Sequence, residues 1–256
     1  MDTTNTGHEA GHKFLARLGK KRLRPGGRIA TEWLLTHSGL QTDSQVLEIA
    51  CNMGTTAIEI AQRFQCHVTG IDMDKQALAN ARDNILGHGL SHLVTVQEAD
   101  ASKLPFPDNH FDVVINEAML TMYADKAKAR LLQEYLRVLK PGGRLLTHDI
   151  ALTEQQEGDC VTQKMQAAIQ VKAQPMLSEA WLTLFRSAGF QNIVHSEGMM
   201  TLMTPKGMLH DEGLSGTLKI IRNALKAENR PQFLKMFRHF RQNRNRLRYI
   251  AVVSTK

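Results

Sequence analysis

Two patterns of apolar positions alternate along the middle of the chain. Short apolar runs, of the kind shown by strands that are buried on both faces, lead up to Ala50, Ile71 and Ile115. The segments between them carry apolar residues at helical spacing, and the clearest such pattern covers residues 124–139. This alternation predicts an α/β fold in which a doubly wound, mostly parallel sheet has helices on both faces.

Seven strands are expected across the whole chain, separated by helices. The strands are expected at residues 46–50, 67–71, 92–97, 113–115, 144–150, 191–195 and 249–253. Helices are expected at 8–23, 28–37, from Thr55 or Thr56 to about 64, 75–86, 124–139, 153–172, 178–188, 209–226 and 231–246.

The 256 residues fit a single domain built on this sheet. Residues 41–150 form its expected core, and helices in residues 1–40 are expected to cover that core. Residues 151–256 complete the other half of the sheet. A long stretch of mixed polar and apolar residues at 203–248 precedes the last strand. We interpret it as a helical insertion that acts as part of a lid.

The clearest chemical signal is the strand, turn and helix at residues 46–61. The strand leads into the turn Cys51-Asn52-Met53-Gly54, and a helix with Thr55 or Thr56 near its start follows. The free N–H groups at the start of such a helix bind anionic or polar groups of a cofactor. The next strand ends at Asp72, and a carboxylate about 20 residues beyond a glycine turn binds ribose hydroxyls in nucleotide-binding units.

Four segments, in this order, resemble motifs of the class I S-adenosylmethionine-dependent methyltransferases. They are residues 48–54, residues 100–101 with 104–106, residues 111–117 and residues 136–143. Together they cover roughly residues 40–150, and they are most similar to the branch that includes quinone-biosynthesis C-methyltransferases and other small-molecule enzymes. The resemblance implies a Rossmann-like fold and S-adenosyl-L-methionine as the cofactor.

The resemblance also implies where the cofactor and the acceptor lie. Asp72 is expected at the ribose, Asp100 and Ala101 at the adenine, and Glu48 with the turn at the methionine part. The full set of expected cofactor contacts is Glu48, Ala50, Cys51, Asn52, Gly54, Thr55, Thr56, Asp72, Met73, Asp100, Ala101, Asn116 and Glu117.

Glu117 and His148 are the candidate catalytic residues, because they lie near the ends of the fourth and fifth strands. A buried histidine that only satisfies a carbonyl group is the competing interpretation for His148. Tyr123 and Asp149 are further candidates beside them. Arg24 or Lys13 is expected to bind the methionine carboxylate or an anionic substrate, unless each is a surface cation.

The turn departs from the family pattern at two positions. Ala50 and Asn52 stand where the family prefers glycine, and only Gly54 is retained. Alanine at position 50 is a small loss if its φ is negative, and asparagine enters the left-handed region readily. A functional turn is therefore expected, with a catalytically inactive relative as the alternative.

The positive charge is concentrated in two stretches rather than spread evenly. The net charge is +7, yet residues 10–31 hold seven basic residues, residues 235–248 hold six, and neither stretch holds an acid. These clusters could attract an anionic substrate, an anionic surface or nucleic acid, or they could be solvated helix faces.

An RNA or DNA methyltransferase is therefore the alternative to a small-molecule enzyme. Against it, the fourth strand ends Asn116-Glu117-Ala118-Met119 and lacks the Pro-Pro-aromatic motif of exocyclic amino methylation. No Pro-Cys nucleophile is present, and the basic stretches lack the stacking platforms that bind single strands. A small-molecule acceptor, anionic or apolar, is the favoured prediction.

Other features point to an ordinary cytoplasmic protein. No apolar run approaches the ~18 residues of a membrane span, and residues 1–14 lack the apolar core of a secretory signal. The three cysteines, Cys51, Cys66 and Cys160, lack the paired spacing of metal sites, so no metal is expected.

Overall fold

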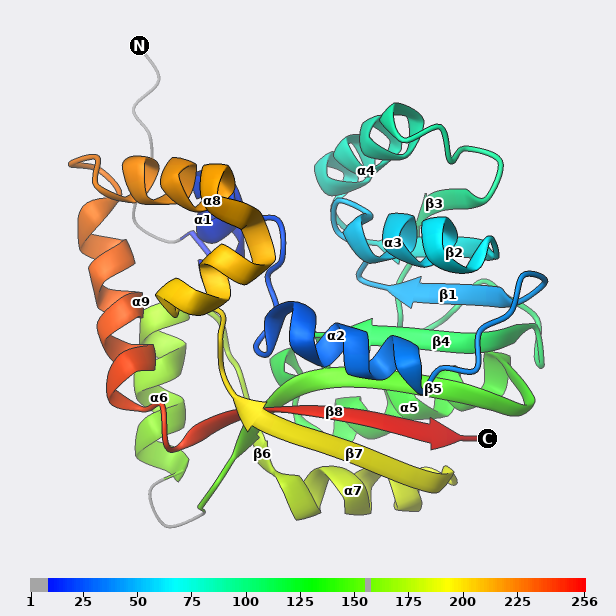
Figure 1. Ribbon diagram of the computed structural model, residues 1–256. Coiled ribbons are helices and arrows are strands. Elements are labelled where there is room, and N and C mark those ends of the chain that lie inside the picture. The colour runs from blue at the N-terminus through cyan, green and yellow to red at the C-terminus, as the bar shows by residue number, and fades with distance from the viewer. Residues whose placement is uncertain (1–8, 155–157) are drawn as a thin grey trace.

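The computed structural model describes residues 9–154 and 158–256 (Figure 1). Three expectations fall partly outside the described residues. They are the beginning of the first helix, the lack of a secretory signal in residues 1–8, and part of the helix expected at 153–172.

Seven strands of the described chain form one continuous sheet in the order β3-β2-β1-β4-β5-β8-β7. Strands β1 to β5 pair in parallel, while β8 lies antiparallel between β5 and β7. The predicted seven-stranded, mostly parallel sheet is confirmed, and an additional strand of two residues, β6, pairs with the end of β5. The strands are β1 Gln45–Ile49, β2 His67–Asp72, β3 Val94–Glu98, β4 Phe111–Glu117, β5 Leu139–Leu152, β6 Met176–Leu177, β7 Gln191–Met199 and β8 Leu247–Thr255.

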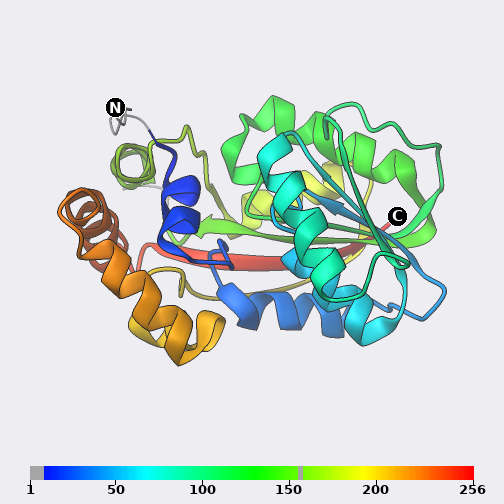
Figure 2. The same cartoon turned by 90° about the horizontal axis from the view of Figure 1, so that it is seen from above.

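Helices cover both faces of this sheet (Figure 2). Val46 and Val113 pack on the layer that contains α2, α3 and α4, whereas their neighbours Leu47 and Val114 pack on the layer that contains α5 and α7. Apolar residues at successive positions of one strand therefore serve two cores, as expected for a strand buried on both sides. These helices are α2 Gly27–Thr36, α3 Thr55–Phe64, α4 Lys75–Gly87, α5 Asp125–Val138 and α7 Ser178–Ser187.

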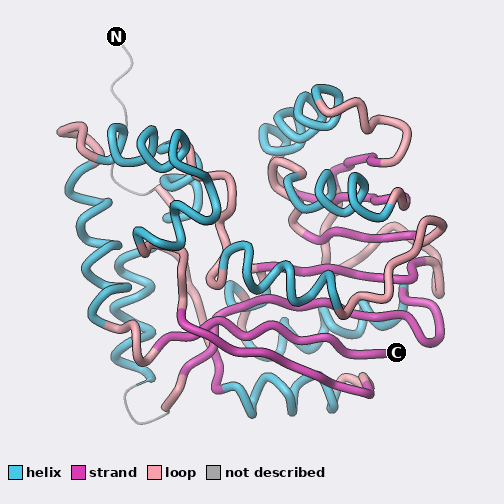
Figure 3. Tube along the Cα trace, viewed as in Figure 1, coloured by secondary structure: helices cyan, strands magenta, loops and turns pink. Residues whose placement is uncertain are grey.

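Four further helices gather at one end of the sheet, beyond the carboxyl ends of β1 and β4 (Figures 1 and 3). We call them the helical cap: α1 Gly11–Leu18, α6 Gly158–Ile169, α8 Pro205–Ala224 and α9 Arg230–Gln242. They enclose a third apolar core that contains Met165, Met200, Met203, Met208 and Met236. The insertion before the last strand is therefore helical and packs against the start of the chain. Its expected first helix begins four residues earlier than the periodicity suggested and is kinked at Gly213, which has φ 69° and ψ −179°.

Candidate active site

The turn between β1 and α3 has three residues in the left-handed conformation, with φ of 54° at Ala50, 48° at Asn52 and 71° at Gly54. The Gly54 N–H donates to the Cys51 carbonyl at 2.8 Å and closes the turn. Asn52 adopts the conformation expected of it. The negative φ at which alanine would be a small loss at position 50 is not adopted, and the left-handed conformation brings Cβ close to the backbone at a cost of about 1–2 kcal/mol.

Asp72 connects the end of β2 to this turn. Its Oδ2 accepts a hydrogen bond from the Asn52 N–H at 2.9 Å, and its Oδ1 accepts one from the Asp74 N–H at 2.9 Å. Asp74 in turn caps α4 and forms an ion pair with Lys13 at 2.7 Å. The carboxylate of Asp72 is thus held in place by backbone donors, only partly buried, and retains lone pairs for a ligand.

The remaining residues of the turn divide into exposed and buried positions. Ala50 and Met73 are exposed, and Thr55 is half-buried at the first position of α3. Cys51 packs so closely on Gly70 that a Cβ at position 70 would lie 2.9 Å from its Sγ. Burial raises the pKa of the Cys51 thiol, which is therefore neutral at physiological pH.

Glu48 lies behind the turn and supports it. Its side chain is buried, and Oε2 accepts the Ala57 N–H in the first turn of α3 at 2.9 Å. Burial raises the pKa of Glu48 to about 8, although Arg24 opposes the shift. Glu48 is therefore mostly protonated at neutral pH, and it acts on the turn through α3.

Glu117, at the end of β4, accepts hydrogen bonds on both of its oxygens. Oε1 accepts from Thr31 at 2.7 Å and from His148 at 3.0 Å, and Oε2 lies 2.8 Å from Arg24 and 3.2 Å from Thr56. Burial alone would raise the pKa of Glu117, but the Arg24 guanidinium, His148 and Thr31 outweigh it and hold the pKa at about 2. Glu117 is thus an ionised carboxylate and a very weak base.

His148, on β5 beside Glu117, uses both ring nitrogens. Nδ1 contacts Glu117, and Nε2 accepts the Gly26 N–H at 2.9 Å, so the network assigns the proton to Nδ1. Gly26 must be glycine at this point, because a Cβ there would lie 2.6 Å from the ring of Tyr249. Arg24 also donates to Thr56 and Thr31. Residues 24–27 are therefore attached to the ends of β4 and β5.

Asn116 precedes Glu117 and lies fully buried on the other face of β4. Its Nδ2 donates to the Tyr135 hydroxyl at 2.9 Å, while its Oδ1 has no hydrogen-bond partner among the described residues. The next residue after Glu117, Ala118, has φ of 56°, a second strained alanine at a strand end. Unpaired buried acceptors and strained backbone concentrate at functional sites, which makes this end of β4 a candidate ligand site.

The other candidates lie around this position. Asp149 is buried and accepts hydrogen bonds from the Thr121 N–H at 3.0 Å and from the Thr121 hydroxyl, and burial raises its pKa. Tyr123 is half-buried. Asp100 is exposed, and the Ser102 N–H at 2.8 Å lowers its pKa, while Ala101 beside it is buried.

The structure therefore collects the predicted residues at the carboxyl ends of β1, β2, β4 and β5, next to the helical cap. Sequence reasoning missed Thr31 and Gly26, which complete the contacts of Glu117 and His148. The break at Arg24-Pro25-Gly26-Gly27 was visible in the sequence, but its distant partners were not.

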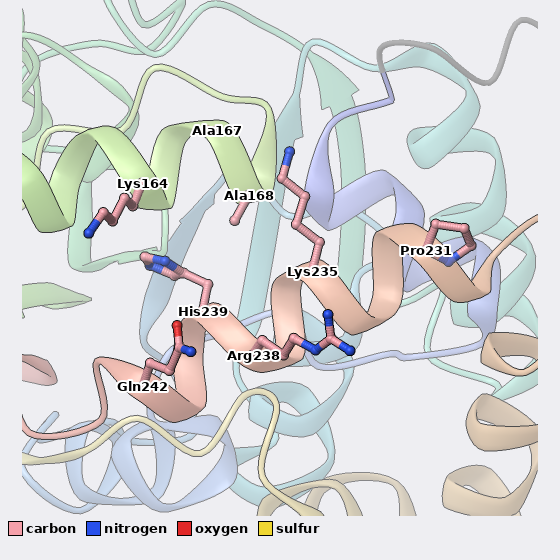
Figure 4. Close-up of a pocket in the computed structure, with 8 residues that line it drawn as sticks. All are labelled: Lys164, Ala167, Ala168, Pro231, Lys235, Arg238, His239 and Gln242. Carbon is pink, nitrogen blue, oxygen red and sulfur yellow. The ribbon is translucent and has the colours of Figure 1, made fainter.

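Two hollows lie elsewhere, on the helical cap. One of about 410 Å³ lies between α6 and α9 (Figure 4). It is lined by Lys164, Ala167, Ala168, Pro231, Lys235, Arg238, His239 and Gln242. Another of about 520 Å³ is lined by Arg238, Arg241, Gln242 and Arg244. Neither hollow includes a residue predicted for the cofactor site. The cationic side chains Lys164, Lys235 and Arg238 in Figure 4 point in different directions and do not converge on one point.

Comparison with known proteins agrees with this geometry. A family model described as a methyltransferase domain matches residues 46–143, which contain the turn, Asp72 and the end of β4. Residues 46–143 are therefore a methyltransferase domain, and the enzyme carries the motifs of the class I S-adenosylmethionine-dependent family. This methyltransferase is 53% identical to an uncharacterized protein of Haemophilus influenzae over 97% of its own chain and 98% of that protein.

Two further proteins are similar to this methyltransferase, one in sequence and one in fold. It is 37% identical to a ubiquinone/menaquinone biosynthesis C-methyltransferase of Azotobacter vinelandii, over 46% of this chain and 47% of that enzyme. The match thus spans about half the length of that relative. A phosphoethanolamine N-methyltransferase 2 of Haemonchus contortus, solved with S-adenosyl-L-methionine, shares the fold with a TM-score of 0.75 at 19% identity, over 96% of this chain and 56% of that one.

The residues of the methyltransferase fit S-adenosyl-L-methionine, the cofactor of this family. The turn exposes Ala50 beside a half-exposed carboxylate at Asp72, which suits ribose hydroxyls. The unpaired Oδ1 of Asn116 supplies a buried acceptor at the neighbouring strand end. Carboxylate, amide and backbone groups are the kinds of group that bind a nucleoside, and Asp72, Asn116 and the turn supply them.

Proposed function

We propose that this methyltransferase transfers the cofactor's methyl group directly to a small-molecule acceptor. The acceptor would lie between the strand ends and the helical cap. The observation that supports this most is the methionine-rich core of the cap beside the predicted cofactor residues, because methionine side chains adapt to apolar ligands. The names of the two similar proteins, a quinone-biosynthesis C-methyltransferase and a phosphoethanolamine methyltransferase, are consistent with a small acceptor that is apolar or anionic.

We assign the cofactor contacts as follows. Asp72 binds the ribose hydroxyls, and Asp100 with Ala101 borders the adenine. The turn at residues 50–56, supported from behind by Glu48, holds the methionine part, and Asn116 and Glu117 lie on the side of the methyl group. When bound, S-adenosyl-L-methionine supplies an electrophilic methyl group whose leaving thioether is neutral.

The chemistry of this chain's own residues is alignment and exclusion of water, because a neutral leaving group needs little acid–base assistance. Glu117 and His148, predicted as catalytic, are better suited to positioning. Every polar atom of the two side chains is already engaged, and Glu117 has a pKa of about 2, which makes it a poor base at neutral pH. Their role would be to hold residues 24–27, which include Arg24, over the cofactor.

A nucleic-acid acceptor is the second candidate, and it rests on the basic residues of α9. The N-terminal basic cluster offers little to it, because Lys20 and Arg24 are buried and paired with acids, and Lys13, Arg17 and Arg22 also form ion pairs. Lys235, Arg238, Arg241 and Arg244, by contrast, form no ion pair with the described residues. The phenylalanines beside them, Phe233, Phe237 and Phe240, are half-buried against the third core and are therefore not free platforms for base stacking.

A labelling experiment separates the two candidates. The enzyme is incubated with S-adenosylmethionine labelled in its methyl group and with either a deproteinised small-molecule extract of bacterial cells or total RNA. We expect label in the extract and none in the RNA, and we expect Asp72→Ala to abolish it while the exposed control Asp83→Ala on α4 retains it. Label in RNA, or label in neither fraction, would contradict the proposal.

A further inference from the structure

The second half of α8, after the kink at Gly213, carries a row of exposed apolar side chains. Leu214 is 68% exposed, Leu218 58%, Ile221 39% and Leu225 64%. Their spacing of four, three and four residues places them on one line along the helix. Single exposed apolar side chains need no explanation, but four in one row on a helix form an apolar face that none of the described residues covers.

The buried face of the same helix is different. Thr217, Ile220 and Ala224 point into the third core of the cap, about a quarter turn away from the exposed row. The exposed row is therefore not needed to attach α8 to the body of the protein.

Basic side chains border the exposed row on its other side. At 100° per residue, Lys219, Arg222 and Lys226 lie about a quarter turn from the leucines, opposite the buried face. Residues 213–227 contain no acid. The face thus combines an apolar line with a cationic border.

Two of the three acids of the insertion are placed away from this face, and the third, Glu228, follows it in the loop before α9. Asp211 and Glu212 precede the kink, are buried, and form ion pairs with Lys20 at 3.3 and 3.4 Å. Glu212 also accepts the backbone N–H groups of Lys21 and Arg22 at 3.0 Å, so the first half of α8 is attached to the chain after α1. The exposed half is consequently presented by a fixed helix. Nearby positive charge adds to it, since eleven basic residues face three acids between 205 and 248: Lys206, Lys219, Arg222, Lys226, Arg230, Lys235, Arg238, Arg241, Arg244, Arg246 and Arg248.

We propose that the second half of α8 docks on an anionic phospholipid surface. Leucine side chains would enter the boundary between headgroups and acyl chains, and Lys219, Arg222 and Lys226 would contact lipid phosphates. A second copy of the chain fits less well, because it would bring like charges together. Nucleic acid would use the cations but not the leucines. None of the helices in residues 9–154 and 158–256 is long and apolar enough to cross a membrane, so the contact is with the surface.

Vesicle flotation tests the proposal without reference to methyl transfer, so its outcome is independent of the proposed function. The full chain is mixed with vesicles of phosphatidylcholine alone or of phosphatidylcholine with phosphatidylglycerol. We expect binding to the anionic vesicles, weakened by salt because surface charges are screened. Leu218→Ser with Leu225→Ser should lower the partition constant roughly a hundredfold, about tenfold for each leucine.

Matched variants separate the parts of the surface. Arg222→Gln with Lys226→Gln should weaken binding to anionic vesicles while leaving the fold unchanged. Leu86→Ser on α4, 71% exposed, is the control for loss of a surface leucine and should bind as the unaltered chain does. Absence of binding to anionic vesicles would overturn the proposal, as would binding that the leucine variants leave unchanged. It would equally be overturned by a dimer in gel filtration that Leu218→Ser dissociates, or by RNA that competes fully with the vesicles.

Discussion

The buried acids Glu48 and Glu117 share one cation, Arg24, and this arrangement predicts how their substitutions combine. At pH 7 Glu117 is ionised and Glu48, with a pKa near 8, is mostly protonated. His148 accepts the Gly26 N–H at Nε2 and contacts Glu117 through Nδ1. Arg24 and Glu117 thus form a buried ion pair whose net charge is zero, which is how charges are tolerated in an interior.

The magnitudes follow from these protonation states. Glu48→Gln exchanges a neutral acid for a neutral amide in the folded chain, at a cost below about 1 kcal/mol, and it removes the proton uptake that folding requires at pH 7, about 1.4 kcal/mol per pH unit above 4.5. It should therefore raise the unfolding free energy at pH 7 by about 2–3 kcal/mol. Glu117→Gln removes the partner of Arg24 at 2.8 Å, but Glu48 can then ionise in its place. At pH 7 that ionisation costs about 1.4 kcal/mol for a pKa near 8, so we expect a loss of about 1.5–3 kcal/mol. The double variant leaves Arg24 buried without a carboxylate and should lose about 3–5 kcal/mol relative to Glu48→Gln.

Urea unfolding at pH 7 of the four proteins in this cycle measures the prediction, provided that circular dichroism and fluorescence give coincident transitions. We expect Glu117→Gln to cost about 1–2 kcal/mol more in the Glu48→Gln background than in the unaltered chain. Additive effects would refute the reasoning. A Glu48→Gln variant as destabilised as Glu117→Gln would refute it too, because it would mean that Glu48 is already ionised.

Two further predictions concern the same region. Because the folded pKa of Glu48 is raised, its contribution to stability is complete below pH 4.5 and is lost as pH rises towards 8. Relative to Glu48→Gln, the unaltered chain should therefore lose about 1.4 kcal/mol per pH unit across that window in urea unfolding, and parallel curves would contradict the raised pKa. Ala50→Gly removes left-handed strain of about 1–2 kcal/mol but adds about 0.5–1 kcal/mol of unfolded-chain entropy, so a net gain of up to about 1 kcal/mol is expected. Ala79→Gly, in the middle of α4, should instead destabilise, and a loss at both positions would show that Ala50 is unstrained.

Much of the fold could be predicted because periodicity is local. The buried strands β1, β2 and β4 and the helix α5 appear in the sequence as runs or stripes, and their boundaries differ from the expected ones by only a few residues. The strand β6 has two residues and no periodicity, so no pattern could have indicated it. The kink at Gly213 was hidden because apolar residues continue through it at helical spacing.

The site was predicted less completely because its contacts are distant in sequence. The basic stretch at 10–31 looked like a charged surface, yet Lys20 is fully buried beside Asp211 and Glu212, which are about 190 residues away. Arg24 likewise meets Glu117 only in the folded chain. The positive φ of Ala50 could not be read from the residue type, since alanine avoids that region and the surrounding turn imposes it.

The most direct test of the account is calorimetric titration of the enzyme with S-adenosylmethionine. Asp72→Ala removes the carboxylate assigned to the ribose hydroxyls, two hydrogen bonds to a charged acceptor, and should weaken binding by about 2–4 kcal/mol, roughly 30- to 1,000-fold. The control Asp83→Ala, an exposed carboxylate on α4, should bind as the unaltered chain does. An unchanged dissociation constant for Asp72→Ala would contradict the assignment of the cofactor site to the ends of β1 and β2.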